Sequence, residues 1–478
     1  MTLFSCRLKH HCLPSFNMKS KTYVQQLALL ASITFLLMLS TSSHLKHKFR
    51  ACRYYLNKIW VRKLDESNES NLETIVPYGQ DDIISLARNL QGAHPMLLAF
   101  DGTGFKSYFL GHTYYNWRYV RLITCMVQAL ESNHPHRFQP GQPVFQMVFT
   151  VLDFLSTECA LESHSCPENA YFAPFVSFSS VFQDPSIFPT AKAFPNPPFS
   201  SCIVNWKMRG GESCHWHQVN NDIKFEELKN RLIWRGTDFC FLHSLYDYES
   251  NDPQMQKLTT RLSLTNPTND VILEEVKNHF PLLTPRWKAV AMSLREREFN
   301  GRNGSDPWID ALFTKGTNDD VHSFFNTRGL TVSSGESMDS ITMSSYKYQI
   351  DLGGGGGTTW EGTLTKLMMP GVLFHHVTPT KDWFYDLMKP YEHYIPVDLE
   401  LENLQAQYEW AEANPEKVKM IAETSTKFAK YLLSHEYIEK VYKDLFIDYF
   451  GALIKAYQHS SDSWEECLEA YSKNGMKL

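Results

Sequence analysis

A run of five glycines followed by two threonines, Gly353–Thr359, is the segment of this sequence best suited to hold a phosphate. It follows a segment, 346–352, that is typical of a β-strand, and it precedes a helical pattern over 363–369. Backbone N–H groups of such a loop and of the helix start supply partial positive charge. The sequence therefore predicts a diphosphate cradle with Gly356, Gly357, Thr358 and Thr359 at its centre. A flexible linker is the alternative, which the flanking strand and helix disfavour.

A second candidate is Arg235-Gly236-Thr237, which follows a short predicted strand at 232–234 and a short predicted helix at 225–231. Arginine offers a charged fork, glycine lets the backbone approach closely, and threonine adds a donor. These residue types suit an anionic ligand at the end of a strand. The alternative is an arginine paired with a carboxylate of this acidic chain.

Asp153 is the candidate general base. It follows a nearly continuous apolar run, 144–152, which predicts a strand buried on both faces, as in a parallel sheet. Open α/β sheets bind ligands beyond the carboxyl ends of their strands, and a partly buried carboxylate there can accept a proton. The alternative is an aspartate that caps the next turn.

Motifs for metals and resident cofactors are missing from the sequence. The glycine run matches neither the P-loop pattern nor G-x-G-x-x-G, and Asp-x-Asp does not occur. His215 and His217 have no second pair at ligand spacing, and His375 and His376 would point to opposite faces of a strand. We therefore expect no metal site and no resident cofactor.

Strand and helix patterns alternate along the chain, which indicates an α/β fold. The segments 95–100 and 105–110, joined by Asp101-Gly102, predict a β-hairpin rather than a phosphate loop. A helix is expected over 118–132, with an apolar face of Val120, Ile123, Val127 and Leu130. Further helices are expected from Thr284-Pro285 to about 298, over 381–388, and from 401 onward with a break at Asn414-Pro415. Strands are expected at 372–376 and 391–397. Residues 168–206 show no long helical period.

The length of the chain limits the number of its domains, and its charge limits the kinds of partner it can bind. The chain has 478 residues, enough for two or three domains, and a formal net charge of −6. Residues 1–63 contain 11 lysines and arginines and no acidic residue, so the remainder is strongly acidic. An acidic body repels the phosphate backbone of nucleic acids, and we expect no nucleic-acid partner.

Residues 22–43 carry no charge and, as a helix, are long enough to cross a bilayer. We expect an uncleaved signal anchor of a single-pass type II membrane protein, although basic residues on both sides leave the orientation open. A signal peptide cleaved near 40–43 is the alternative. Asn68 and Asn303 lie in glycosylation sequons, and Cys159 with Cys166 is the local candidate for a disulfide.

Several blocks resemble glycosyltransferase family 90, which contains Rumi-type protein O-glucosyltransferases and fungal capsule xylosyltransferases. They cover roughly residues 90 to 470, and their order and spacing carry the resemblance. The strongest block runs from Tyr346-Lys-Tyr-Gln-Ile-Asp-Leu through the glycines to Lys366-Leu-Met-Met-Pro-Gly-Val-Leu-Phe-His-His and Trp383-Phe-Tyr-Asp-Leu-Met-Lys-Pro-Tyr-Glu-His-Tyr-Ile-Pro-Val397. Shorter blocks are Phe175-Val-Ser-Phe-Ser-Ser-Val, Ile233-Trp-Arg-Gly-Thr237, Pro307-Trp-Ile-Asp-Ala-Leu-Phe-Thr314 and the stretch 437–457.

The resemblance implies a GT-B fold, in which two Rossmann-like domains face a cleft, and an inverting, metal-independent transfer from UDP-glucose or UDP-xylose. It places the catalytic base at Asp153 and the donor phosphates at Arg235, Gly236 and Thr237. Many members carry an arginine where this chain has Thr363, and no arginine occurs after Ile350. Extra N–H groups of the long glycine run and the charge of Lys366 are the expected substitutes.

The implied organisation is a cytosolic tail (1–21), an anchor (22–43), a stem (44–75), an N-terminal domain with the acceptor site and base (76–222), a C-terminal UDP-sugar domain (223–429) and helices that cross back to the N-terminal domain (430–478). The expected activity is glycosyl transfer to a hydroxyl of a protein or glycan acceptor, in the lumen of the Golgi or endoplasmic reticulum. The alternative is a lumenal sugar-nucleotide-binding or scaffold protein without catalysis.

Overall fold

The computed structural model describes residues 75–89, 95–109, 117–151, 173–184, 190–209, 219–239, 241–242, 253–303, 306–316 and 319–459, all of which belong to one compact unit, Thr74–Leu478. The expected tail, membrane anchor and most of the stem lie outside these residues, as do Asn68, Asp153, Cys159, Cys166, His215 and His217. Within the described part of the chain, no helix is long and apolar enough to cross a membrane.

The N-terminal sheet has the strand order β3-β2-β4-β5-β7. The strands are β2 (Met96–Phe100), β3 (Phe105–Phe109), β4 (Phe145–Thr150), β5 (Phe175–Ser177) and β7 (Ala191–Ala193). The hairpin β2–β3 is confirmed, with Phe100 opposite Phe105. The Asp101 carboxylate accepts the N–H groups of Thr103 and Gly104, so the turn is closed by its own aspartate and the hairpin interpretation holds.

Strand β4 is buried at all six positions, as its apolar run predicts. It is parallel to β5 but antiparallel to β2, so the predicted parallel pairing is confirmed on one side of this central strand and wrong on the other. An antiparallel neighbour that is covered on both faces produces the same continuous apolar run, and the sequence pattern cannot separate the two cases.

The helices of this part are α3 (Gln80–Asn89), α4 (Trp117–Asn133) and α6 (Pro197–Arg209). Helix α4 occupies the predicted segment, but its buried residues include Leu122, Cys125, Met126 and Ala129, whereas Val120 is exposed. Leu130 of the predicted face is also buried, and Ile123 and Val127 pack against the core, so the predicted face is wrong only at Val120. Helix α6 was missed because it begins with two prolines inside a stretch that lacks a clear helical period.

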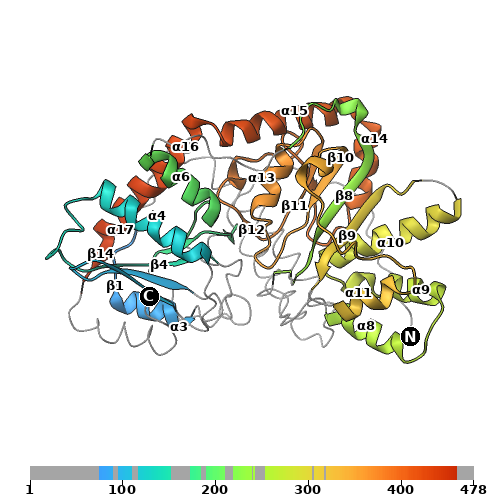
Figure 1. Cartoon of the computed structure of the whole chain (residues 1–478), viewed down its shortest axis with the longest axis horizontal. Helices are drawn as coiled ribbons and strands as arrows, with labels where there is room; N and C mark the ends of the chain where they lie inside the picture. The colour runs from blue at the N-terminus through green and yellow to red at the C-terminus, as the bar shows by residue number, and fades with distance from the viewer. Residues whose placement is uncertain are drawn as a thin grey trace, which may run out of the picture. The chain divides into compact units, whose positions relative to one another are not determined.

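The C-terminal sheet is parallel throughout and has the order β13-β11-β10-β8-β9 (Figure 1). Its strands are β8 (Lys229–Asp238), β9 (Ile309–Gly316), β10 (Tyr346–Asp351), β11 (Val372–His376) and β13 (Ile395–Val397). In chain order this is the doubly wound arrangement 2-1-3-4-5, in which connections leave β8 and β10 toward opposite edges. Ligand sites of such sheets lie beyond the carboxyl ends of the two strands at this switch point.

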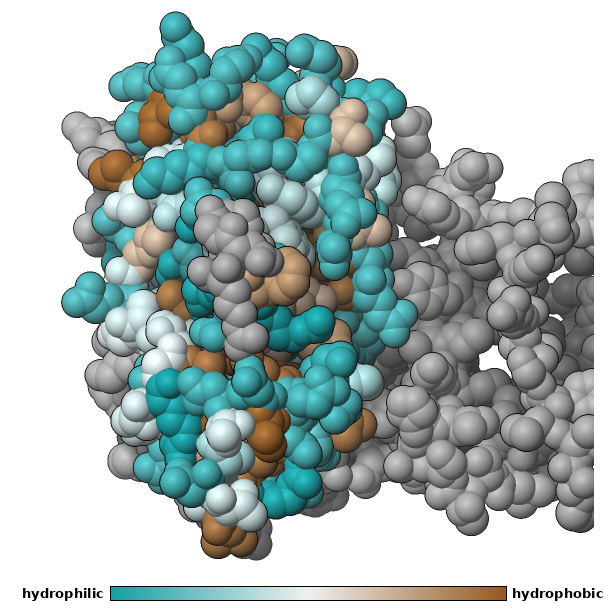
Figure 2. Space-filling model, turned by 90° about the vertical axis from the view of Figure 1, so that its right-hand side faces the viewer, coloured by the Kyte–Doolittle hydropathy of each residue, from teal (hydrophilic) through white to brown (hydrophobic). Residues whose placement is uncertain are grey.

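The helices around this sheet are α8 (Pro253–Ser263), α9 (Asn269–His279), α10 (Pro285–Asn303), α11 (Asp319–Asn326), α12 (Ser340–Met343), α13 (Glu361–Leu367), α14 (Leu404–Ala413) and α15 (Pro415–Leu432), with 3-10 turns at Phe225–Glu227 and Phe280–Leu282. The predicted start of α10 and the break between α14 and α15 are confirmed. Figure 2 views the structure from the α8–α11 side, where hydrophobic residues are interspersed among hydrophilic ones.

Four short predictions around this sheet were wrong in extent or type. Strand β8 continues to Asp238 instead of ending before Arg235, the predicted helix before it is only a 3-10 turn, and strand β13 begins at Ile395. Residues 381–388 form the end of strand β12 (Thr380–Lys381) and a 3-10 turn (Tyr385–Leu387) rather than a helix. Pairing of β12 with β6 (Val181–Phe182) holds the segment extended.

The C-terminal elements pack on the N-terminal sheet. They are α16 (His435–Val441), a π-helix (Tyr442–Tyr449), α17 (Phe450–Ala456) and β14 (Tyr457–Gln458), which pairs with β1 (Tyr78–Gly79). In Figure 1 these orange-to-red helices lead back to the blue β1. Phe446 and Phe450 contact Phe194 in a shared hydrophobic core, so burial of aromatic surface fixes the crossing.

Candidate functional site

A pocket of about 360 Å³ lies at the carboxyl ends of β8 and β10, the switch point of the C-terminal sheet. Six of the predicted donor-binding residues line it: Arg235, Gly236, Thr237, Thr358, Thr359 and Lys366. The other lining residues are Trp234, Phe239, Arg286, Leu352, Gly354, Trp360 and Gly362. The fold thus brings together two segments that are more than a hundred residues apart in the chain.

The glycine run is a compact turn that only glycine can form at two of its positions. A Cβ atom on Gly353 would lie 2.3 Å from the Gly357 carbonyl oxygen, and one on Gly357 would lie 2.2 Å from Thr380 Oγ1. Gly357 also has a φ of +81°, which side-chain-bearing residues rarely adopt. The Gly357 N–H donates to the Gly354 carbonyl at 2.9 Å, which closes the turn. These close contacts identify the run as an ordered loop rather than a linker.

Gly356 and Gly357 are buried behind this loop and are not among the lining residues. The Gly356 carbonyl accepts hydrogen bonds from Ser180 Oγ at 2.9 Å and from Thr380 Oγ1 at 2.5 Å. Thr378 Oγ1 donates to the Gly357 carbonyl at 2.9 Å. Their contacts therefore fix the loop from behind, and Thr358 and Thr359 are the loop hydroxyl residues that reach the pocket wall.

Trp360 ends the loop with strained backbone geometry, φ 53° and ψ −105°, one residue before α13 begins. The Trp360 indole N–H donates to Ser179 Oγ at 3.0 Å, and Trp360 lines the pocket. Residues 179 and 180 follow β5 of the N-terminal sheet. One wall of the pocket is therefore held from the N-terminal sheet.

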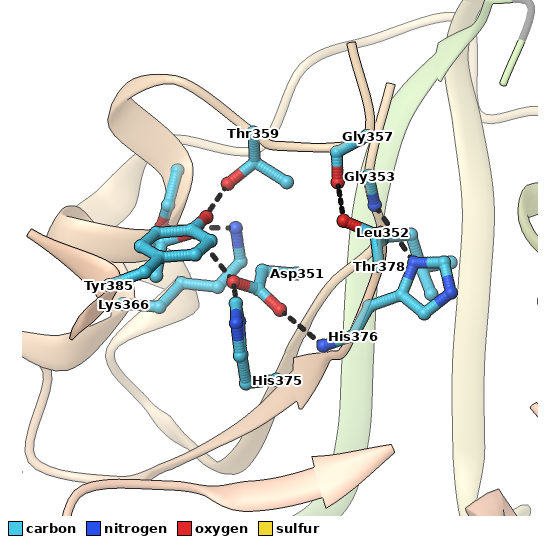
Figure 3. Close-up of polar contacts among 12 residues, drawn as sticks. Asp351, Leu352, Gly353, Gly357, Thr359, Lys366, His375, His376, Thr378 and Tyr385 are labelled. Atoms are coloured by element: carbon cyan, nitrogen blue, oxygen red, sulfur yellow. Dashed lines mark hydrogen bonds and ion pairs between the residues drawn. The ribbon is translucent and has the colours of Figure 1, made fainter. Parts of the chain in front are cut away.

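A buried polar network centred on Asp351, the last residue of β10, lies behind the pocket (Figure 3). The Asp351 Oδ2 atom is 2.8 Å from His375 Nδ1 and accepts from Thr363 Oγ1 at 2.6 Å, and its Oδ1 atom accepts the His376 N–H at 2.9 Å. Thr363 Oγ1 is also 2.7 Å from Thr359 Oγ1 and 2.7 Å from the Tyr385 hydroxyl. The network therefore connects Asp351 to Thr359 at the pocket wall.

Thr363 has no exposed surface and is absent from the pocket lining. Its hydroxyl group connects Asp351, Thr359 and Tyr385 in the network. In this arrangement Thr363 cannot make the direct contact with a sugar-nucleotide donor in the pocket that the sequence predicted. The two neighbouring histidines face different partners, as predicted for a strand. His376 Nδ1 accepts the Gly353 N–H at 3.2 Å, and its Nε2 lies 2.9 Å from the Leu399 carbonyl.

Burial is the largest single influence on the pKa of each of the four groups described next. Burial lowers the pKa of His376 to about 4, so the ring is neutral and its Nδ1 can accept from Gly353. Burial opposes ionisation of Asp351, but His375, Thr363 and Lys366 together hold its pKa below the ordinary value. Burial, with the nearby Arg286 charge, lowers the pKa of Lys366, which Asp351 partly counteracts. Burial raises the pKa of Tyr385, which remains a protonated phenol.

Arg235 lines the pocket, but its guanidinium is engaged at the neighbouring strand. Nη2 is 3.0 Å from Asp310 Oδ2, and Nη1 donates to the Asp310 carbonyl at 2.7 Å and to the Trp234 carbonyl at 2.8 Å. Arg297 approaches the same carboxylate at 3.7 Å. These contacts tie β8 to β9 and satisfy much of the Arg235 charge.

Arg286, in the first turn of α10, was missed by sequence reasoning. Its Nε donates to the Gly353 carbonyl at 3.0 Å, Nη1 to the Thr237 carbonyl at 2.9 Å, and Nη2 to the Leu352 carbonyl at 3.2 Å. The helix start was predictable, but the approach of Arg286 to residues 352–353 depends on tertiary folding. An arginine in the first turn of a helix was the one available signal, since cations there oppose the helix dipole.

The remaining predicted residues are Asn303, Asn68 and Asp153. Asn303 is the last residue of α10, and Asn68 and Asp153 lie outside the described residues. Across the described ranges, no cluster of three or more histidine, cysteine, aspartate or glutamate side chains could hold a metal ion.

The family comparison covers part of this site. Residues 318–474 match the sequence model of glycosyl transferase family 90. The predicted resemblance to this family is therefore confirmed. The matched segment includes β10, the glycine loop and Lys366, whereas Arg235 and Arg286 lie before it.

Matches to curated proteins are short. Protein O-glucosyltransferase 2 of Danio rerio is 30% identical over 110 residues, 22% of this chain and 20% of the relative. Protein O-glucosyltransferase 3 of Mus musculus is 28% identical over 111 residues, 23% of this chain and 22% of the relative. Uncharacterized protein 179R of Invertebrate iridescent virus 6 is 39% identical over 67 residues, 14% of this chain and 6% of that protein. The matched part of the chain thus spans about a fifth of the length of the two O-glucosyltransferases.

Proposed function

We propose that the chain is an inverting, metal-independent glycosyltransferase that moves glucose or xylose from a UDP-sugar to a hydroxyl group of a protein or glycan. The observation that carries the proposal is the pocket at the switch point of the C-terminal sheet. It joins two cationic residues, Arg286 and Lys366, to hydroxyl-bearing loop residues in a chain that matches glycosyl transferase family 90. Such a lining suits the diphosphate of a nucleotide sugar.

The parallel C-terminal sheet and the separate N-terminal sheet support a GT-B arrangement as part of this proposal. The donor binds in the C-terminal pocket, and the acceptor binds on the side of the N-terminal sheet. Asp153, three residues after β4 ends, takes the proton from the acceptor hydroxyl. The acceptor oxygen forms a bond to the anomeric carbon while the bond from that carbon to the UDP oxygen breaks. UDP departs with its charge held by the pocket.

The proposed location is the membrane of the Golgi or endoplasmic reticulum, with residues 22–43 as a single-pass type II anchor and the body in the lumen. Cys202 on α6 is disulfide-bonded, which supports an oxidising compartment. The sequons at Asn68 and Asn303 are consistent with glycosylation there. These features support the location independently of the transfer reaction.

A lumenal protein that binds a sugar nucleotide without turnover is the second candidate. It is favoured by one observation, the buried threonine at the position where many family members carry an arginine. It predicts UDP binding without sugar transfer to any acceptor. Enzyme and binding protein therefore differ in a single measurable quantity, UDP release.

The test incubates the purified full-length chain with UDP-glucose, UDP-xylose and other UDP-sugars, with EDTA or with Mn²⁺, and measures released UDP. Release from one sugar that is insensitive to EDTA is the expected result and identifies the donor. Asp153→Asn should abolish release and retain UDP binding. Binding without release across a panel of protein and glycan acceptors would favour the binding protein, and release that requires Mn²⁺ would refute metal independence.

A further inference from the structure

We propose that Trp360 and Ser179 are positioning residues that form a latch between the two sheets. Through this latch the N-terminal sheet holds the glycine loop, residues 353–359, in its compact turn, and a ligand in the pocket alters the N-terminal sheet in return. The latch itself is a property of the ligand-free protein, and only its consequence for sugar transfer rests on the proposed function.

The backbone of Trp360 adopts a conformation that residues with a side chain rarely occupy. Its φ is 53° and its ψ is −105°. These angles lie outside the left-handed helical region, where most other residues with a positive φ are found. Such a conformation raises the energy of the folded chain and persists only where the surrounding contacts impose it. The strain at Trp360 therefore requires contacts that hold the residue in place.

A buried hydrogen bond ties Trp360 to the other sheet. Its indole N–H donates to Ser179 Oγ at 3.0 Å, and Ser179 is 2% exposed. Ser179 follows β5 of the N-terminal sheet, whereas Trp360 directly precedes α13, which packs on the C-terminal sheet. Because water has little access to this hydrogen bond, it is stronger than one at the surface. The strained residue is thus fixed by a segment that lies 181 residues earlier in the chain.

The next residues contact the same loop and the segment behind it. We call residues 179–183 the strap. Ser180 Oγ donates to the Gly356 carbonyl at 2.9 Å, and Ser180 is 1% exposed. The side-chain amide of Gln183 donates to the Thr378 carbonyl at 2.8 Å. The strap therefore binds both the glycine loop and the segment that leads into β12.

Strand β12 links the position of the strap to the loop. It pairs with β6 of the strap, with Thr380 opposite Phe182. Thr380 Oγ1 donates to the Gly356 carbonyl at 2.5 Å. Thr378 Oγ1 donates to the Gly357 carbonyl at 2.9 Å (Figure 3). A displacement of the strap would therefore shift two further hydrogen-bond donors of the loop.

The latch reaches the pocket, because Trp360 and Thr359 both line its wall. A ligand in contact with these residues favours the loop conformation that it binds best. Coupling between two sites is reciprocal, so a strap that stabilises the latched loop is itself stabilised by that ligand. Occupation of the pocket should therefore be detectable at the strap, on the N-terminal sheet.

The first test measures amide hydrogen exchange in the ligand-free, full-length chain by mass spectrometry. Peptides that cover residues 353–362 report on the loop. Within it, the Gly354 N–H donates to the Thr358 carbonyl at 3.0 Å and the Gly357 N–H to the Gly354 carbonyl at 2.9 Å. Such amides exchange when their hydrogen bonds open locally. Peptides from β10 and β11 report on the sheet behind the loop.

Ser179→Ala removes the acceptor of the latch, and Trp360→Phe removes its donor while keeping an aromatic ring. Trp308→Phe is the matched control. Trp308 is half-buried like Trp360, but its Nε1 atom has no hydrogen-bond partner among the described residues, and it does not line the pocket. Urea unfolding establishes that each variant is folded.

We expect the loop to exchange roughly tenfold faster in Ser179→Ala and in Trp360→Phe, the usual effect of losing one buried hydrogen bond, with β10 and β11 unchanged. Trp308→Phe should exchange as the wild type does. Wild-type exchange of the loop in both latch variants would overturn the latch. Equally faster exchange of the loop and of β10 would also overturn it, because the hydrogen bond would then stabilise the whole domain rather than the loop.

A second pair of variants tests the strain. Trp360→Ala and Trp360→Gly both remove the indole ring, but only glycine adopts a positive φ without a steric cost. After correction for the intrinsic exchange rates of the two residues, the loop should exchange more slowly in Trp360→Gly than in Trp360→Ala. Equal exchange, or faster exchange in Trp360→Gly, would show that Trp360 is not strained and would overturn the latch as a strained device.

The last test adds UDP, with its binding followed by calorimetry. Saturation with UDP should slow the exchange of peptides that cover residues 175–183 in the wild type. This protection should be smaller in Trp360→Phe at a UDP concentration that also saturates the variant, which a merely structural role of Trp360 would not produce. Equal protection in both proteins, or none in a wild type that binds UDP, would overturn the coupling.

These results are separable from the proposed function. Loop exchange that depends on Ser179 and Trp360, in a protein that binds no UDP, would support the latch and refute both the coupling to UDP and the proposed function. Sugar transfer with loop exchange that is indifferent to both residues would support the transferase and refute the latch.

Discussion

Replacing Thr358 with valine should stabilise the ligand-free protein and weaken UDP binding, two effects of opposite sign from one substitution. Valine has the shape of threonine without the hydroxyl group. The Thr358 Oγ1 atom is buried and has no partner in the described structure, so it loses its hydrogen bond to water without compensation on folding. An unsatisfied buried hydroxyl costs about 1–3 kcal/mol, and we expect the free energy of unfolding to rise by about 1 kcal/mol.

Thr363→Val is the matched comparison, since it makes the same chemical change five residues away. The Thr363 hydroxyl contacts Asp351 at 2.6 Å and both Thr359 and Tyr385 at 2.7 Å. Its loss leaves a buried carboxylate with one fewer donor. A hydrogen bond to a charged group contributes about 1.5–3 kcal/mol, so this variant should lose roughly 2 kcal/mol of stability.

Urea unfolding without ligand and calorimetry with UDP measure the two quantities. Thr358→Val should bind UDP roughly tenfold more weakly, since a hydrogen bond from the hydroxyl to a charged phosphate oxygen is lost. A fall in stability that matches Thr363→Val would show that the Thr358 hydroxyl has a partner in the folded protein. Unchanged UDP affinity would show that the hydroxyl does not meet the ligand, and the reasoning from the orphan group would fail.

Three further substitutions test the frame of the site. Burial lowers the pKa of His376 from 6.5 to about 4, so between these pH values the unfolded chain binds a proton that the folded protein does not. The free energy of unfolding should therefore fall by about 1.4 kcal/mol for each pH unit between 6.5 and 4. His376→Gln should remove this pH dependence, as measured by urea unfolding at about pH 7 and at about pH 5. Asp351→Asn should cost about 3 kcal/mol, because it removes the buried carboxylate that His375 and Thr363 contact; a loss below about 1 kcal/mol in the same urea assay would show that these contacts contribute little to stability. Gly357→Ala should lower the thermal stability more than Gly141→Ala, because both glycines have a positive φ but only at Gly357 would the added Cβ atom clash with neighbouring side chains. Equal losses would mean that the side chains of Thr380 and Leu242 move to make room for the Cβ atom.

The local elements of the site were predictable from sequence because their signals are local. The strand before the glycines, the helix after them, and the start of α10 at Pro285 all follow from short patterns of apolar residues, glycine and proline. The prediction that the run is an ordered loop rests on the same flanking elements. The order of the strands in the sheet, which creates the switch point, is a tertiary property that no short pattern encodes.

The distribution of charge was less predictable. Arg235 has the residue type and strand position of a phosphate ligand, yet Asp310 on β9 takes its guanidinium, as the alternative interpretation of the sequence allowed. Thr363 occupies the position of a missing cation but is buried as a junction between Asp351 and Tyr385. Sequence spacing identifies which residues are close along the chain, and it does not show which partner a long side chain selects.

The clearest case is Arg286, 67 residues before its carbonyl partner on Gly353. An arginine on the helix after the glycine loop would compete for space with the Asp351 network, whereas one on α10 enters from the side of β8 and binds the ends of both strands. The sheet order makes this route possible, because β8 and β10 are neighbours even though β9 separates them in the chain. A search for phosphate-binding motifs therefore finds the glycine loop but not the arginine beside it. The loop is encoded in one segment, whereas the position of Arg286 depends on the order of the strands in the sheet.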